Sequence, residues 1–236
     1  MDLEVVVDNS VLLARCLGPS IDAKAEPAEL AFKTLETAGI TPKLTESLHA
    51  EFETKLHERI GQILEAVREL AQATAPIPAT GGDPLDLLEG IFARLRAKTE
   101  GSGAALLILE TRISSLVREQ GQLTVDLWSS LLNSCAAETI RLLAEVQRRF
   151  DLIGVQVIPQ SKGIDQEPFR DVIAKTDLDH IASCAAFAAS RKCVVLFVTF
   201  DGKLHGAREE ILKQTANRVV VTAPIYLERQ IKKQAE

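Results

Sequence analysis

The sequence lacks the cysteine spacing that indicates a disulfide framework or a zinc site. Its four cysteines, Cys16, Cys135, Cys184 and Cys193, include no CxxC pair, and three of them sit among apolar residues. The four histidines are scattered and share no ligand spacing with the cysteines, which argues against structural zinc. We therefore expect four buried free thiols and a reducing compartment.

Long apolar runs are also missing. No run approaches the roughly 20 residues that a helix needs to cross a bilayer. The N-terminus has neither a basic segment nor the short apolar stretch that is typical of a secretion signal. We therefore expect a cytoplasmic protein that makes no membrane contact.

The sequence has few aromatic residues, and it has no excess of positive charge. Aromatics make up 4% of the 236 residues, with one Trp and one Tyr, while 46% of the residues are hydrophobic. The core of this chain is therefore expected to be large and mostly aliphatic. The formal net charge of −6 excludes a polycationic nucleic-acid coat, so any phosphate contact would need a local basic patch or a bound cation.

Short apolar runs alternate with amphipathic stretches along most of the chain. Runs of this kind predict strands over 3–10, 40–44, 155–159, 194–200 and 219–221. Helices are predicted over 11–17, 27–38, 46–71, 84–98, 103–119, 124–150, 177–190, 209–216 and from 225 onward, with 169–175 a short helix or loop. Strands that alternate with helices indicate an α/β fold with a mainly parallel central sheet and helices on both faces.

Several single residues predict where helices begin and end. Gly39 fits a C-terminal cap, Thr45 an N-cap, and Asp83 an N-cap followed by Pro84 at the first helical position.

The middle third of the chain is helical and carries no motif. The simplest interpretation is a single α/β domain over 1–236 with a helical insertion over 72–150. Leu-rich helix faces beyond what a core needs are typical of interfaces, so a homodimer stays open as an alternative.

Four acids are placed where such a fold would bring them together. Asp8 follows the apolar run Val5–Val7, and Asp201 follows the later run over 194–200. The carboxyl ends of parallel strands meet at one edge of the sheet, where open α/β folds bind ligands. Asp177 opens the helix before the later strand, and Glu51 lies in the helix after 40–44.

Such a group of carboxylates has a definite chemistry. Neighbouring carboxylates repel one another and raise each other's pKa unless a cation is present. Hard oxygen ligands select Mg²⁺ or Mn²⁺, and these ions polarise phosphodiesters and activate water in many nucleases.

Taken singly, each acid has an ordinary structural explanation. Asp8 can cap the following helix, and Asp201-Gly202 is a turn signal. Asp177 and Asp179 can both interact with a helix dipole, and Glu51 can belong to a solvated helix face. Only the set, in its order along the chain, points to function.

That set resembles the PIN domain family of metal-dependent nucleases. The resemblance lies in Asp8-Asn9-Ser10 after the first strand, an acid in an early helix, the pattern D-x-x-H-I-A from Asp177, and V-T-x-D ending at Asp201. It covers 1–55 and 155–221 and leaves out the helical middle third.

The resemblance implies a PIN-like three-layer α/β/α fold and a ribonuclease, most simply an endonuclease that hydrolyses RNA, single-stranded or structured, with Mg²⁺ or Mn²⁺. It assigns catalysis and metal binding to Asp8, Glu51, Asp177 and Asp201. Glu46 is the alternative to Glu51, and Asp179 is the alternative to Asp177. The supporting residues that it implies are Asn9, Ser10, Asp179, His180 and Thr199.

Two other functions are weighed against this one. A haloacid-dehalogenase-like phosphatase also begins with an acid after a strand, but it requires a second Asp where this chain has Ser10. An inactive PIN-like scaffold would bind RNA or a protein through the helical insertion.

His180 and His205 have no assigned role beyond packing or substrate contact, and Lys203, Arg208 and Lys213 are candidate phosphate contacts.

Overall fold

The computed structural model describes residues 2–19, 22, 24–73, 83–98, 103–120, 125–161, 167–169 and 172–235. The chain divides into two compact units. The first comprises 1–19, 24–55 and 148–236, and the second comprises 20–23 and 56–147. The residues 72–150, predicted as a helical insertion, overlap mostly with the second unit.

The first unit contains a five-stranded parallel sheet in the order β3-β2-β1-β4-β5. Its strands are β1 (Leu3–Val7), β2 (Lys43–Thr45), β3 (Gln156–Ile158), β4 (Val194–Val198) and β5 (Val219–Thr222). The central strands β1 and β4 pair from Leu3 with Val194 to Val7 with Val198. β4 is buried along its whole length, as a strand covered on both faces must be. The α/β class and the parallel sheet predicted from the sequence are therefore confirmed.

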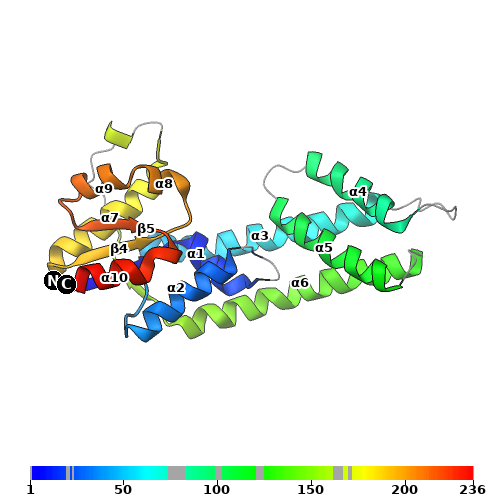
Figure 1. Ribbon diagram of the computed structural model, residues 1–236, viewed down its shortest axis with the longest axis horizontal. Helices are drawn as coiled ribbons and strands as arrows, with labels where there is room; N and C mark the ends of the chain where they lie inside the picture. Colours follow the sequence, from blue (N-terminus) through cyan, green and yellow to red (C-terminus); the bar gives the residue numbers. More distant parts are fainter. Residues whose placement is uncertain are drawn as a thin grey trace. The chain divides into compact units, whose positions relative to one another are not determined.

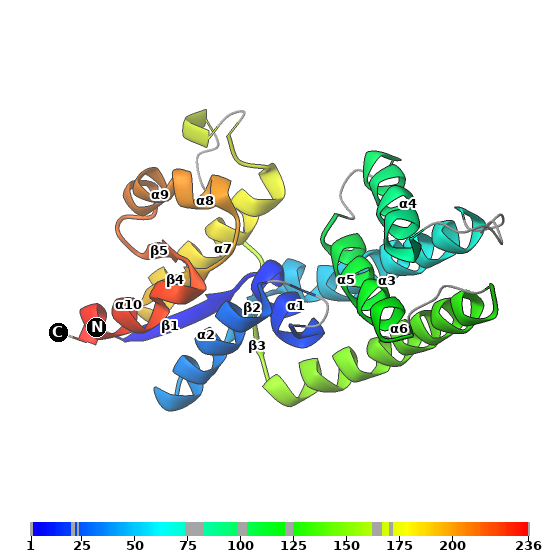
Figure 2. The same ribbon diagram turned by 45° about the vertical axis from the view of Figure 1, so that its right-hand side comes forward.

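Helices cover both faces of this sheet. The helices that lie wholly within the first unit are α1 (Asn9–Leu17), α2 (Ala25–Thr37), α7 (Lys175–Arg191), α8 (Gly202–Gly206), α9 (Arg208–Gln214) and α10 (Leu227–Ala235), with short 3-10 turns at Glu167–Phe169 and Pro224–Tyr226. Figures 1 and 2 show α7 and α9 on one side of the strands, with α2 and α10 on the other. This arrangement is a three-layer α/β/α architecture.

The predicted capping residues place the ends of two helices. Gly39 has a φ of 66° and its N–H donates to Glu36 O, so it ends α2 in a left-handed turn. Thr45 Oγ1 accepts a hydrogen bond of 3.2 Å from Leu48 N, so α3 (Glu46–Ala73) begins directly after β2. The start of α3 therefore lies at the carboxyl end of the sheet.

Several predicted boundaries differ from those of the structure. β4 ends at Val198 rather than at residue 200, because the Thr199 hydroxyl accepts the Asp201 N–H and turns the chain. α2 begins at Ala25 rather than Pro27, because a proline in the first turn needs no N–H partner. The strand predicted over 40–44 is confined to Lys43–Thr45, and α8 follows Asp201 where only a turn was expected.

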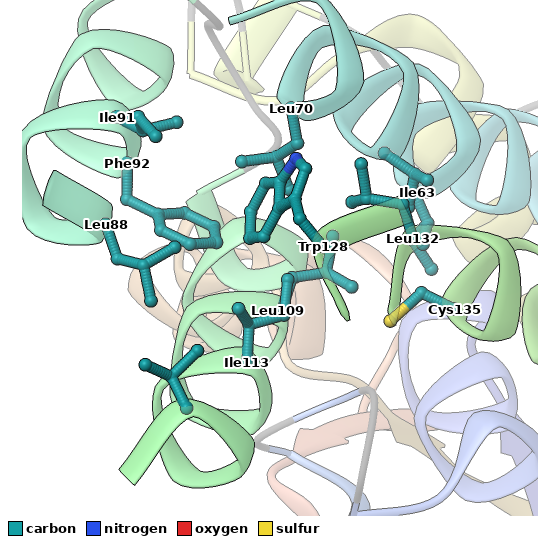
Figure 3. Close-up of a cluster of buried hydrophobic side chains, with 12 residues drawn as sticks. Ile63, Leu70, Leu88, Ile91, Phe92, Leu109, Ile113, Trp128, Leu132 and Cys135 are labelled. Carbon is teal, nitrogen blue, oxygen red and sulfur yellow. The ribbon is translucent and has the colours of Figure 1, made fainter. Parts of the chain in front are cut away.

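The second unit is helical and has a core of its own. It contains α4 (Pro84–Lys98), α5 (Gly103–Gln120) and parts of the long helices α3 and α6 (Val125–Ile153). Asp83 Oδ1 accepts from Leu85 N at 2.9 Å, which confirms the predicted N-cap of α4. Figure 3 shows Trp128 in the middle of this core, with Phe92 on one side and Ile63 on the other.

All four cysteines are free and buried, as the sequence predicted. Across the described ranges, no helix is both long enough and apolar enough to cross a membrane.

Candidate functional site

The two central strands meet at a topological switch point. β1 continues to β2 on one side, whereas β4 continues to β5 on the other, so the connections leave the adjacent strands in opposite directions. Open α/β folds form their ligand crevice at such a point. Asp8 follows β1 and Asp201 comes three residues after β4, and Asp8 N donates to Val198 O at 2.9 Å. The structure thus brings these two acids to the same crevice.

The Asp8 carboxylate is held by hydroxyl groups and not by the helix that follows it. Its Oδ2 accepts hydrogen bonds from Ser10 Oγ at 2.5 Å and from Thr199 Oγ1 at 2.7 Å. Asp8 stands at the N-cap position of α1 but makes no side-chain capping bond, so the capping explanation for this acid is wrong. Among the described residues nothing donates to Oδ1, which leaves that oxygen available to a ligand.

Asp201 divides its two oxygens between structure and the crevice. Its Oδ1 caps α8 by accepting from Lys203 N at 2.6 Å and from Leu204 N at 3.4 Å, so the turn explanation is correct for this oxygen. Asp201 N donates to Thr199 Oγ1 at 2.9 Å. Thr199 therefore links both acids, since its hydroxyl also donates to Asp8.

The pKa of Asp177 responds to the charges of the other three acids. Asp177 is the third residue of α7, and its pKa is raised from 3.8 to about 6. Burial is the largest cause, followed by the negative charges of Asp201, Asp8 and Glu51, while the Lys203 ammonium acts in the opposite direction. Three other carboxylates therefore lie within electrostatic reach of Asp177, as mutual repulsion in a shared crevice requires.

The structure distinguishes the alternatives that the sequence left open. Glu51 is half-buried and acts on Asp177. Glu46 is exposed and accepts a 3.0 Å hydrogen bond from Gln160 N. The charge of Asp179 acts on His180, and its backbone carbonyl accepts from a serine in the next turn of α7. The geometry therefore favours Glu51 and Asp177.

His180 joins α7 to the beginning of α3. Its Nδ1 lies 2.8 Å from Ser47 Oγ and 3.1 Å from Thr45 Oγ1. The ring is 3% exposed, and burial lowers its pKa although Glu51 and nearby aspartates oppose that shift. His180 thus fixes the corner at which α3 begins, five residues before Glu51. Sequence reasoning missed Thr45 and Ser47 as its partners, because their pairing spans more than 130 positions of the chain.

Asn9 ties α1 to α3 and leaves one oxygen without a partner. Its Nδ2 donates to Leu48 O at 2.9 Å, one turn before Glu51. Its Oδ1 is buried and accepts no hydrogen bond from the described residues. A buried acceptor beside Asp8 is normally satisfied by water or a cation.

The candidate ligands are of the kind that a hard divalent cation prefers. They are all oxygen atoms, including the free Oδ1 of Asp8, the second oxygen of Asp201 and the orphaned Asn9 Oδ1. Within the described ranges, no three Asp, Glu, His or Cys side chains are already close enough to hold one ion. The carboxylates would therefore have to turn toward a shared ion.

The remaining candidates differ in their surroundings. His205 Nε2 donates to Thr199 O at 2.9 Å, so this histidine supports the backbone of the turn. Of the basic residues predicted to contact phosphate, Lys203 acts on Asp177, whereas Lys213 lies 3.7 Å from Glu210. Arg208 is exposed at the first turn of α9.

Comparisons of the chain with protein-family models, with curated proteins and with solved structures found no significant match.

Proposed function

We propose that this chain is a PIN-like nuclease that hydrolyses RNA with the help of Mg²⁺ or Mn²⁺. The observation that carries the proposal is the junction at the switch point, where Thr199 Oγ1 donates to Asp8 Oδ2 and accepts from Asp201 N. Burial and then the charges of Asp201, Asp8 and Glu51 raise the pKa of Asp177, which supports it. These four acids come from four separate segments that meet at the switch point of a parallel sheet. No packing requirement explains why like charges are gathered there, since each of them raises the free energy of the others.

The residues of the crevice have distinct roles in this proposal. Asp8, Asp177, Asp201 and Glu51 would hold the cation, and Ser10 and Thr199 orient the Asp8 carboxylate by donating to one of its oxygens. A bound divalent cation supplies charge that offsets the carboxylates, polarises the phosphodiester and activates water.

Neighbouring groups shape the site without holding the cation. His180 and Asn9 contact the first turns of α3 and so help to set the position of Glu51. Lys203, whose charge acts on Asp177, would add positive charge for the substrate phosphate.

The test is the Asp8→Asn substitution, assayed on fluorescently labelled RNA with Mn²⁺. Asparagine keeps the oxygen that accepts from Ser10 and Thr199 but loses the charge. We expect the cleavage rate to fall at least about a hundredfold, since several kcal/mol of transition-state stabilisation depend on the cation, while the circular dichroism spectrum stays unchanged. EDTA should have the same effect on the wild type.

A matched control uses an exposed acid of the same unit. Glu209→Gln, in the first turn of α9, should cleave RNA at the wild-type rate. Full activity of Asp8→Asn, or activity in EDTA, would overturn the proposed function. A labelled DNA strand of the same sequence, assayed in parallel, identifies the preferred nucleic acid.

One observation favours a second candidate, a PIN-like scaffold without catalysis. The acids in the described residues are not pre-arranged to hold an ion, as would suit a fold that binds RNA or a protein through its helical unit. Stabilisation by Mn²⁺ without cleavage of any RNA would support the scaffold, whereas metal-dependent cleavage excludes it.

A further inference from the structure

A half-exposed aromatic residue adjoins the acidic crevice in the chain. Phe200 stands between Thr199 and Asp201, and the Lys24 ammonium lies 5.1 Å from the centroid of its ring. Other phenylalanines of the chain, such as Phe52 and Phe197, are fully buried. An accessible ring with a cation over it, next to four acids, is not explained by the packing of the core.

Both members of this pair are fixed in place. Phe200 N donates to Ser10 Oγ at 3.2 Å, and Ser10 in turn donates to Asp8. The backbone of Phe200 is therefore part of the same network that orients the acid. Lys24 immediately precedes α2, and its carbonyl accepts from Ala28 N at 3.1 Å. The lysine is thus anchored by the helix at its backbone and by the ring at its ammonium.

The charge of the site creates a need for such a cation. The chain carries a net charge of −6, and a nucleic acid that approaches four carboxylates meets strong repulsion. Local cations are what let an acidic protein bind a phosphate backbone. A ring contact attracts an ammonium group without placing a further negative charge beside it.

We propose that Lys24 binds a phosphate of the nucleic acid next to the one that is cleaved, and that the Phe200 ring helps to position its ammonium. The inference rests on the proposed function only in taking nucleic acid as the substrate. Phe200 contacts no reacting atom in this proposal, so it affects RNA binding only by positioning Lys24.

The experiment measures binding apart from cleavage. The full chain with Asp8→Asn is titrated into a labelled, single-stranded 20-nucleotide RNA at several salt concentrations, followed by fluorescence anisotropy. Adding Lys24→Gln should remove one phosphate contact, so that the slope of log K against log salt becomes less steep by about 0.7 and affinity at 50 mM salt falls about five- to tenfold. Phe200→Leu should weaken binding, and Phe200→Tyr should restore it because the ring is retained.

The chain supplies a matched control for the pair. The Arg191 guanidinium lies 5.9 Å from the ring centroid of Phe187 at the other end of α7 from Asp177, roughly 20 Å along the helix axis at 1.5 Å per residue. Arg191→Gln should leave both the affinity and the salt slope unchanged.

The two proposals fail in different ways. An unchanged salt slope in Lys24→Gln, equal binding by Phe200→Leu and the wild type, or no binding of RNA at any salt concentration overturns the role of Lys24 and Phe200. RNA that is bound in a Lys24-dependent manner but never cut by the chain with Asp8 intact overturns the nuclease and leaves this inference standing.

Discussion

One hydroxyl group connects the two acids at the centre of the site. Thr199 Oγ1 donates to Asp8 Oδ2 and accepts from Asp201 N, and the residue is fully buried. A hydroxyl can do both because it carries one proton and two lone pairs. The resemblance implied a supporting role for Thr199 but not this bond to Asp8, which lies 191 positions earlier in the chain.

Thr199→Val tests that connection with a side chain of the same shape. We expect Mn²⁺ affinity to fall about 10- to 100-fold, as on loss of other groups that orient metal ligands. The free energy of unfolding should fall by about 1–3 kcal/mol, because the Asp201 N–H is left without its acceptor. Calorimetric Mn²⁺ titration and urea unfolding measure these effects. Thr222→Val, a buried threonine at the end of the next strand, should leave Mn²⁺ affinity unchanged.

The raised pKa of Asp177 predicts how stability depends on pH. The folded protein keeps this proton up to about pH 6, whereas an ordinary aspartate releases it near 3.8. Stability from this group is therefore fully present below about pH 4 and is lost as the pH rises toward 6. In EDTA, the melting temperature of the wild type should fall more steeply over that range than that of Asp177→Asn. Equal pH slopes in thermal melts would contradict the assignment.

At the scale of the element, a buried lysine joins three strands. Lys43 Nζ on β2 lies 3.0 Å from Glu4 Oε2 on β1 and donates to Gln156 Oε1 on β3 at 2.7 Å. The Lys43 side chain is 9% exposed and that of Glu4 is 28% exposed. Burial is therefore unequal, and the two ends of this pair should respond differently to substitution.

Removing the acid should cost more than removing the lysine. Glu4→Gln leaves a buried ammonium with a neutral partner, which should lower the free energy of unfolding by about 3 kcal/mol. Lys43→Met leaves only a carboxylate that water can reach, so its cost should be about 1 kcal/mol or less. Urea unfolding of both variants gives the order. Glu228→Gln, which breaks an exposed pair with Lys232, should have no measurable effect.

The elements themselves were largely predictable, but their ends were less so. The run Val5–Val7 and the spacing of apolar residues in α3 identify a strand and a helix because periodicity is local. The helix α8 was missed because it depends on Asp201 capping two backbone N–H groups. The edge at which Asp8 and Asp201 meet was predictable from parallel strands. The partners Thr45, Ser47 and Lys24 were not, since their contacts are tertiary.

At the scale of the whole molecule, each unit has its own hydrophobic core. The second unit contains the single tryptophan of the chain, Trp128, which is 3% exposed among residues such as Phe92. Its fluorescence therefore reports the packing of that unit alone.

Phe92→Ala should disturb this reporter directly. The cavity left by a fully buried phenylalanine should lower the free energy of unfolding by about 3–5 kcal/mol, and tryptophan emission should move to longer wavelengths. Phe32→Ala, at a half-buried position on α2 of the first unit, should leave the emission maximum unchanged. A red shift in both variants would contradict the assignment of Trp128 to a separate core.

The strand order also has a consequence for synthesis of the protein. β1 is made first, yet its neighbour β4 begins at Val194, and Asp8 must wait for Thr199 before its carboxylate is oriented. At about 5–20 residues per second, a ribosome needs roughly 10–40 s to make the intervening chain. During that interval the nascent polypeptide carries Asp8 and Glu51 without the other half of the crevice. In the nuclease proposed above, the acidic crevice would therefore be complete only after Thr199 and Asp201 have been synthesised.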